Sequence, residues 1–325
     1  MKAPLFYDAV MGSRAFSLFL KDASSSLGHA YMVVCPDDET VAEFFTLAAT
    51  TLFCETGSAC LECSACRRVL ANGEPDITEI FPDGTAVKVA QIKAMTADAY
   101  ISPTGSRKLY FVHRADLMTA EAQNKLLKTL EEPPENVTFF LGTANQSRLL
   151  DTVRSRCRPL VILPFPRETV FAGLRALGVD KDTAAAAASC SDGCLGLAKQ
   201  FADSPRPGEM YREAAALLAG MKRSPDVLAA SRTPSLAANA AEFLPLLATA
   251  TRDVLTIKTG GSVPAAPDTT ALLKEAAATF SLRALAVTQK LINKALEELS
   301  YRVDTLSVTD NLLFSILEVK HKWQS

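Results

Sequence analysis

The sequence predicts an α/β domain with a parallel sheet, followed by domains built only of helices. Three observations support this. Over the first 165 residues, short apolar runs alternate with helical patterns, which is typical of a parallel sheet. After Pro164-Phe165-Pro166 almost all periodicity is helical. The chain has 325 residues, 48% hydrophobic and 22% charged, which is ample for more than one packed core.

Strands and helices follow one another in the first domain. Each predicted strand is a short apolar run bounded by turn residues, and each predicted helix carries apolar residues three and four positions apart. Thr119 is a candidate cap for the last helix, and Pro133-Pro134 ends it. The predicted strands cover residues 31–34, 77–81, 109–112 and 137–141, and the predicted helices cover residues 40–53, 89–100 and 119–131.

Two breaks divide the rest of the chain. Pro205-Arg206-Pro207-Gly208 reads as a linker, and residues 259–264 are a predicted loop within the last helical part. We therefore expect three domains: an α/β domain over 1–165, a small helical domain over 166–207 and a larger helical domain over 208–325.

Charge and hydropathy exclude some classes of protein. Lys and Arg number 34 and Asp and Glu 36, so no chain-wide basic surface for solitary nucleic-acid binding is expected. No run of 18 or more apolar residues predicts a membrane span, and the first residues lack the apolar core of a signal peptide. We expect a cytoplasmic protein.

Four of the eight cysteines gather between residues 54 and 66. Zinc prefers four tetrahedral ligands, and two-residue gaps let neighbouring thiolates reach one ion. Four thiolates leave no open position, so such a zinc site would be structural. Four unrelated thiols and a redox Cys-x-x-Cys pair are the alternatives. The predicted zinc ligands are Cys54, Cys60, Cys63 and Cys66.

The order of elements is that of an AAA+-type P-loop ATPase, but the phosphate-handling residues are missing. A phosphate loop needs glycines, a lysine and a hydroxyl, whereas the window Cys35–Ala42 has no Gly or Lys and holds three carboxylates. After the third strand, where an acidic pair would hold magnesium, the chain has His113-Arg114 and then Asp116. We expect His113 to be a strand-end histidine with a local hydrogen bond, and the chain to hydrolyse no ATP.

Four stretches resemble one family, the delta-prime subunits of bacterial DNA polymerase III clamp loaders. They lie in order along residues 54–157. The third is the longest and most specific. They are the cysteine cluster followed by residues 73–77, then residues 87–92, the run Asp116–Asn136, and residues 147–150 leading to Arg154-Ser155-Arg156-Cys157.

The resemblance implies a role in replication. Clamp loaders are five-subunit rings that place the sliding clamp on primed DNA. A delta-prime subunit is the non-hydrolysing member, whose Ser-Arg-Cys motif supplies an arginine in trans to ATP on the neighbouring gamma/tau subunit. That arginine is Arg156 here, with Ser155 and Cys157 as supporting residues. The implied partners are gamma/tau, delta, the clamp and primer-template DNA. The small helical domain corresponds to a lid and the last domain to an oligomerisation collar.

The chain also departs from its family. The family usually has a longer gap than the five residues between Cys54 and Cys60. In active relatives a lid motif carries a second arginine, but the matching stretch Gly193–Ala198 has Leu197 there. The main alternative is a gamma/tau-type ATPase with a degenerate phosphate loop. A zinc scaffold outside replication is the third hypothesis.

Overall fold

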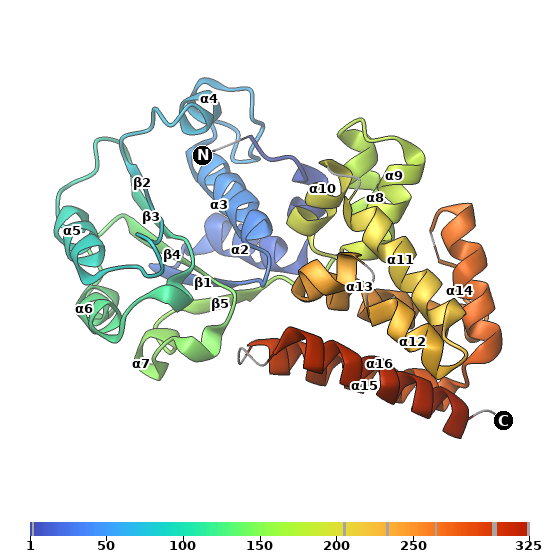
Figure 1. Cartoon of the computed structure of the whole chain (residues 1–325). Coiled ribbons are helices and arrows are strands. Elements are labelled where there is room, and N and C mark those ends of the chain that lie inside the picture. The colour runs from blue at the N-terminus through green and yellow to red at the C-terminus, as the bar shows by residue number, and fades with distance from the viewer. Residues whose placement is uncertain (2, 204–205, 232–233, 264, 301–303, 324–325) are drawn as a thin grey trace. The chain divides into compact units, whose positions relative to one another are not determined.

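A computed structural model describes residues 1, 3–203, 206–231, 234–263, 265–300 and 304–323 (Figure 1). Its contacts divide the chain into two compact units. The first consists of residues 1–165 with residues 194–196, and the second of residues 166–193 with the chain from 197 onward. Residues that the sequence assigns to a lid and to a last domain thus pack in one unit, and the division into three domains stays a prediction.

The first unit contains one parallel sheet of five strands, in the order β2-β3-β4-β1-β5. This confirms the predicted α/β fold class. The four predicted strands are present within a few residues of their expected ends, and β5 is an additional edge strand. Their bounds are β1 Ala30–Val34, β2 Ile77–Ile80, β3 Lys108–Val112, β4 Val137–Thr143 and β5 Arg158–Val161.

Helices cover both faces of this sheet, because alternate side chains of each strand point to opposite sides. Tyr110 and Phe139 belong to the core beneath α5 and α6. Phe111 and Phe140 stack on each other on the other face, where aromatic rings of α2 and α3 also pack. The helices and 3₁₀ turns of this unit are α1 Tyr7–Met11, α2 Arg14–Ser25, α3 Asp38–Phe53, α4 Ser64–Leu70, α5 Val89–Ala99, η1 Ala115–Leu117, α6 Ala120–Glu131, η2 Gln146–Arg148 and α7 Asp151–Arg154.

The second unit is entirely helical in the residues described. Tyr211 donates a 2.5 Å hydrogen bond to the buried Asp253, which also pairs with Arg167. Beside it, Arg252 pairs with Asp192 at 2.6 Å. These contacts join Arg167 and Asp192 to residues of the chain that follow position 206. The helices are α8 Arg167–Ala176, α9 Lys181–Cys190, α10 Leu195–Asp203, α11 Arg206–Gly220, α12 Ser224–Ser231, α13 Pro234–Lys258, α14 Pro267–Thr279, α15 Leu282–Ser300 and α16 Thr305–Lys322.

Two further sequence expectations concern the second unit. Of the predicted linker, residue 205 lies outside the described residues, and α11 begins at Arg206. The predicted loop at 259–264 falls between α13 and α14, with residue 264 outside the description. None of the described helices is long and apolar enough to cross a membrane.

A buried lysine makes the stability of the second unit depend on pH. Lys320 is 2% exposed, and its ammonium group donates to the Met221 carbonyl at 2.7 Å beneath the Phe280 ring. Burial lowers the pKa of Lys320 to about 8, against 10.5 for the free side chain. Between these values the unfolded chain binds more protons than the folded chain, so the stability rises as the pH rises.

We expect the deprotonation of Lys320 to raise the free energy of unfolding by about 3 kcal/mol as the pH rises from 8 to 10.5. Because other groups titrate in the same range, the measurement is the difference between the native chain and a Lys320→Met variant in denaturant titrations. The exposed neighbour Lys322, changed to Met, serves as the control. Parallel pH profiles for the native chain and Lys320→Met would contradict this prediction.

Candidate functional site

The four clustered cysteines lie on a short segment between α3 and α4. Cys54 directly follows the last residue of α3, Cys63 caps the start of α4, and Cys66 lies in the first turn of α4. Cys60 lies in the loop between them. That loop turns sharply, with positive φ at Gly57, Ala59 and Leu61. All four predicted ligands are thus brought together, including Cys54 with its short spacing.

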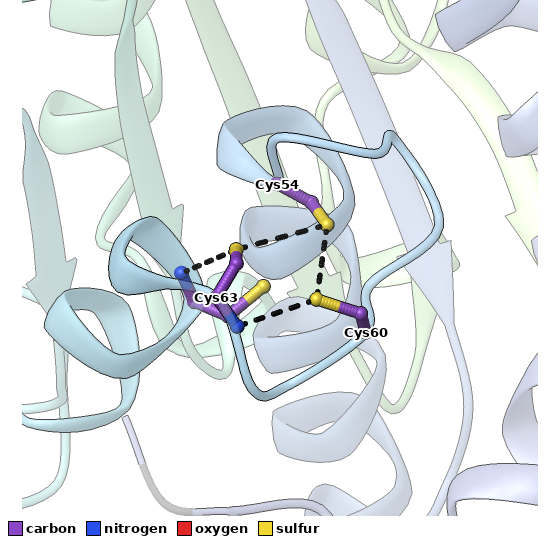
Figure 2. A group of neighbouring side chains, drawn as sticks. Cys54, Cys60 and Cys63 are labelled. Carbon is purple, nitrogen blue, oxygen red and sulfur yellow. Dashed lines mark hydrogen bonds between the residues drawn. The ribbon is translucent and has the colours of Figure 1, made fainter.

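The sulfur atoms have the spacing of a tetrahedral metal site. All four Sγ atoms lie within 4.8 Å of one another. The Sγ of Cys54 is 3.6 Å from that of Cys60 and 4.0 Å from that of Cys63 (Figure 2). A tetrahedral zinc ion with bonds of 2.3 Å requires sulfur atoms about 3.8 Å apart. The cluster can therefore hold a metal ion.

Backbone amides stabilise the thiolate form of these ligands. The amide of Cys63 donates to the Cys60 sulfur and the amide of Cys66 donates to the Cys63 sulfur, both at 3.4 Å (Figure 2). The Cys66 amide lowers the pKa of the Cys63 thiol, whereas burial raises the pKa of Cys66. Four sulfur ligands fill the coordination of a tetrahedral ion, so the site has no position for substrate water.

The degenerate phosphate window places a carboxylate where a phosphate loop would bind phosphate. Residues 35–37 follow β1, and α3 begins at Asp38. The Asp37 carboxylate accepts a 2.6 Å hydrogen bond from the Thr40 hydroxyl and a 2.8 Å bond from the Gly196 amide. A Cβ atom at Gly196 would lie 2.5 Å from the Asp37 carboxylate and 2.7 Å from Glu39 Cβ, so a larger residue would force these side chains to shift. The Asp37 carboxylate at the start of α3 thus binds the Thr40 hydroxyl and the Gly196 amide and accepts no capping hydrogen bond from the amides of α3.

An arginine stands where the acidic pair of an ATPase would lie. Arg114 follows β3 in a left-handed conformation, with φ of 52°. Its guanidinium bridges Asp38 at 3.0 Å and Asp116 at 3.2 Å. Burial disfavours ionisation of Asp116, but hydrogen bonds from Arg114 and from the Ala144 amide hold its pKa below its usual value. Asp116 is therefore a paired structural carboxylate.

His113 makes the local hydrogen bond expected of it. Its Nε2 lies 2.9 Å from a carboxylate oxygen of Glu79 at the edge strand β2. The ring stacks on Phe81 with centroids 4.2 Å apart, and Phe45 packs against it edge-on. This packing gives His113 a structural place at the end of β3.

The segment that leads to the predicted motif arginine, Arg156, is held in place by one buried glutamine. Gln123 on α6 donates to the carbonyls of Met118 and Arg148, both at 3.2 Å, and accepts from the Leu150 amide at 2.7 Å. These bonds use both amide protons and the amide oxygen. The turn that leads into α7 is thereby held against α6.

The Ser-Arg-Cys motif follows α7 directly. Cys157 is buried in the core, and burial raises its pKa to about 12, so it is a packing residue. Ser155 is exposed and donates to the Thr152 carbonyl at 3.2 Å. The Arg156 side chain is 32% exposed, and its Nη2 donates to Glu131 at 2.6 Å. The guanidinium is within reach of a partner at the surface.

Sequence reasoning missed three residues whose side chains position segments of the first unit. Gln123 and Glu131 lie inside the long third motif, and Asp76 lies in the first. The Asp76 carboxylate is 2% exposed and accepts the amides of Thr104 and Gly105 at 2.8 and 2.5 Å. The motifs contained the signal, but contacts between residues 25 to 29 positions apart cannot be read from a local pattern.

Comparison with known proteins matches the first unit of the chain. A family model described as DNA polymerase III, delta subunit, matches residues 14–166. The DNA polymerase III subunit delta′ of Bacillus subtilis is 38% identical over 149 residues, which is 44% of this chain and 45% of that protein. The subunit delta′ of Escherichia coli is 35% identical over 144 residues, 43% of each chain. The resemblance to delta-prime subunits is thus confirmed over this part of the chain.

Subunits of the gamma type are also similar. The DNA polymerase III subunit gamma of Buchnera aphidicola, from Acyrthosiphon pisum, is 34% identical over 134 residues, 40% of this chain and 37% of that protein. The chain spans less than half the length of the curated relatives it matches. Among solved structures, a gamma-subunit-related protein of Thermotoga maritima is 19% identical, with a TM-score of 0.40 over 94% of this chain and 98% of the other.

Proposed function

We propose that this chain is a non-hydrolysing, delta-prime-like subunit of a DNA polymerase III clamp loader, which completes the ATP site of a neighbouring gamma/tau subunit with Arg156. One observation carries the proposal. Charged side chains of this chain lie in the two regions where a P-loop ATPase would bind phosphate and magnesium. Asp37 lies at the start of α3, and Arg114 lies between Asp38 and Asp116. Arg156, in contrast, is partly exposed, and it lies in the Ser-Arg-Cys motif to which the resemblance to delta-prime subunits assigns the arginine supplied in trans.

The proposal includes the partners that such a role requires. Gamma/tau and delta would join this chain in a ring, and the clamp and primer-template DNA would be met through that ring. Residues 166–207 would act as a lid and residues 208–325 as a collar. The cysteine cluster would hold one structural Zn²⁺ through Cys54, Cys60, Cys63 and Cys66, since thiolates suit zinc and the sulfur spacing fits it. The chain would bind no ATP.

A gamma/tau-type ATPase is the second candidate, because gamma subunits are among the similar proteins. The two candidates differ in nucleotide affinity. Each carboxylate within about 4 Å of a phosphate oxygen opposes its binding by about 1–4 kcal/mol at effective dielectric constants of 80 to 20. The window offers Asp37, Asp38 and Glu39, and no lysine.

We expect calorimetric titration of the metal-loaded chain with Mg²⁺-ATP to give no binding up to about 1 mM ATP, a level at which a competent site would be saturated. A gamma subunit with an intact phosphate loop, titrated in the same buffer, is the positive control. Micromolar affinity of this chain would reject the first candidate and favour the second.

A further inference from the structure

The guanidinium of Arg156 is held by three oxygen atoms. Its Nη1 donates to the Thr152 carbonyl at 2.7 Å and approaches the Ser155 hydroxyl at 3.4 Å, and both acceptors lie in its own turn of chain. Its Nη2 donates to Glu131 Oε1 at 2.6 Å. Glu131 is the last residue of α6, so it alone of these three connects Arg156 to another element.

These three contacts leave part of the Arg156 guanidinium available to bind another acceptor. A guanidinium carries five N–H donors in a rigid plane. The three contacts use at most both Nη1 protons and one Nη2 proton, which leaves at least the Nε proton and one Nη2 proton. Two donors in one rigid plane can bind two oxygens of a phosphate group. Arg156 can thus remain on Glu131 while it binds a phosphoryl group.

Without Arg156, the position of Glu131 would be electrostatically unfavourable for a carboxylate. A carboxylate at the last residue of a helix faces the negative end of the helix dipole. Glu132 and Glu135 follow it closely in the chain. The Arg156–Glu131 pair is partly exposed, and exposed pairs contribute little to stability. The contact therefore does more to orient Arg156 than to hold the fold together.

We propose that Glu131 is a positioning residue for Arg156: it fixes the guanidinium before the neighbouring subunit presents its nucleotide. This inference rests on the proposed function of Arg156. A free arginine side chain loses several rotatable bonds when it is fixed in one geometry, and an arginine that is already oriented loses less freedom on reaching the transition state. Glu131 therefore accelerates hydrolysis without touching the nucleotide.

The test uses the complete clamp loader, reconstituted with its gamma/tau and delta subunits. We expect Glu131→Ala to lower the kcat of ATP hydrolysis by roughly three- to tenfold while the KM for ATP changes less than about twofold, because the interaction acts in the transition state. Glu131→Gln keeps an oxygen acceptor for Nη2 and is expected to recover most of kcat. Glu135→Ala removes the same charge from the same segment and serves as the matched control.

Two further variants separate this inference from the proposed function. If Arg156→Ala leaves hydrolysis unchanged, the proposed function fails and this inference fails with it. If Arg156→Ala lowers hydrolysis but Glu131→Ala leaves kcat unchanged or raises it, only the positioning role is overturned. In the double variant, loss of Glu131 should add nothing to the loss of Arg156. A purely structural role would instead lower the melting temperature of Glu131→Ala and leave kcat intact.

Discussion

Changing Arg156 to alanine is expected to lower the rate of ATP hydrolysis at the adjoining gamma/tau site by about 10³-fold or more, the effect of an arginine supplied in trans to a γ-phosphoryl group. The clamp-loading rate on primed DNA should fall with it. The fold should be unaffected, because the side chain is partly exposed and its contacts are limited to Glu131 and its own turn. Single-turnover hydrolysis and clamp loading by the reconstituted complex measure both effects.

The control lies two residues away. Arg154 is paired with Asp151 within α7 and falls outside the Ser-Arg-Cys motif, so Arg154→Ala should leave hydrolysis near the native rate. Arg156→Lys keeps the positive charge but loses the planar fork, and we expect it to recover only part of the rate. Clamp loading at the native rate by Arg156→Ala would remove Arg156 from the mechanism.

The second large effect concerns the cysteine cluster. We expect the native chain to carry one zinc ion, and Cys63→Ser to lose it. Structural zinc binds short peptides with apparent free energies of about 10–16 kcal/mol, and part of this energy stabilises the fold. The cluster joins the end of α3 to the start of α4, so its loss should release residues 54–66 and lower the melting temperature of the first unit.

Two measurements check this prediction. Elemental analysis gives the metal content, and amide hydrogen exchange shows whether the loss of protection is confined to the segment around the cluster. Cys194→Ser is the control, because Cys194 lies outside the cluster. A native chain that carries no metal after purification without chelators, and that takes up none when zinc is added, would reject the site.

The sequence predicted the parallel sheet and the cysteine cluster, because both depend on local patterns. The strand β5 was not predicted. It is short, begins with an exposed Arg158 and contains Pro159, and such residues are tolerated only at an edge. The position of Gly196 beside Asp37 could not be predicted either, since 159 residues separate them. The role of Gln123 could not be predicted for the same reason, since two of its three partners, Arg148 and Leu150, lie 25 and 27 residues away.

The Arg114 bridge bears on whether this fold could regain a nucleotide through small evolutionary steps. A phosphate loop over Cys35–Ala42 needs glycine at positions 35 and 40 and lysine at position 41, so restoring it would leave Asp38 and its bridge to Arg114 in place. Removing Arg114 would leave Asp116, whose side chain is 2% exposed, with the Ala144 amide but without its charged partner, at a cost of about 1–3 kcal/mol. Restoring the loop alone would therefore leave the Asp38 carboxylate opposing the phosphates, and removing Arg114 alone would destabilise the fold. If the chain is the non-hydrolysing subunit that we propose, its Asp38, Arg114 and Asp116 oppose a return to nucleotide binding.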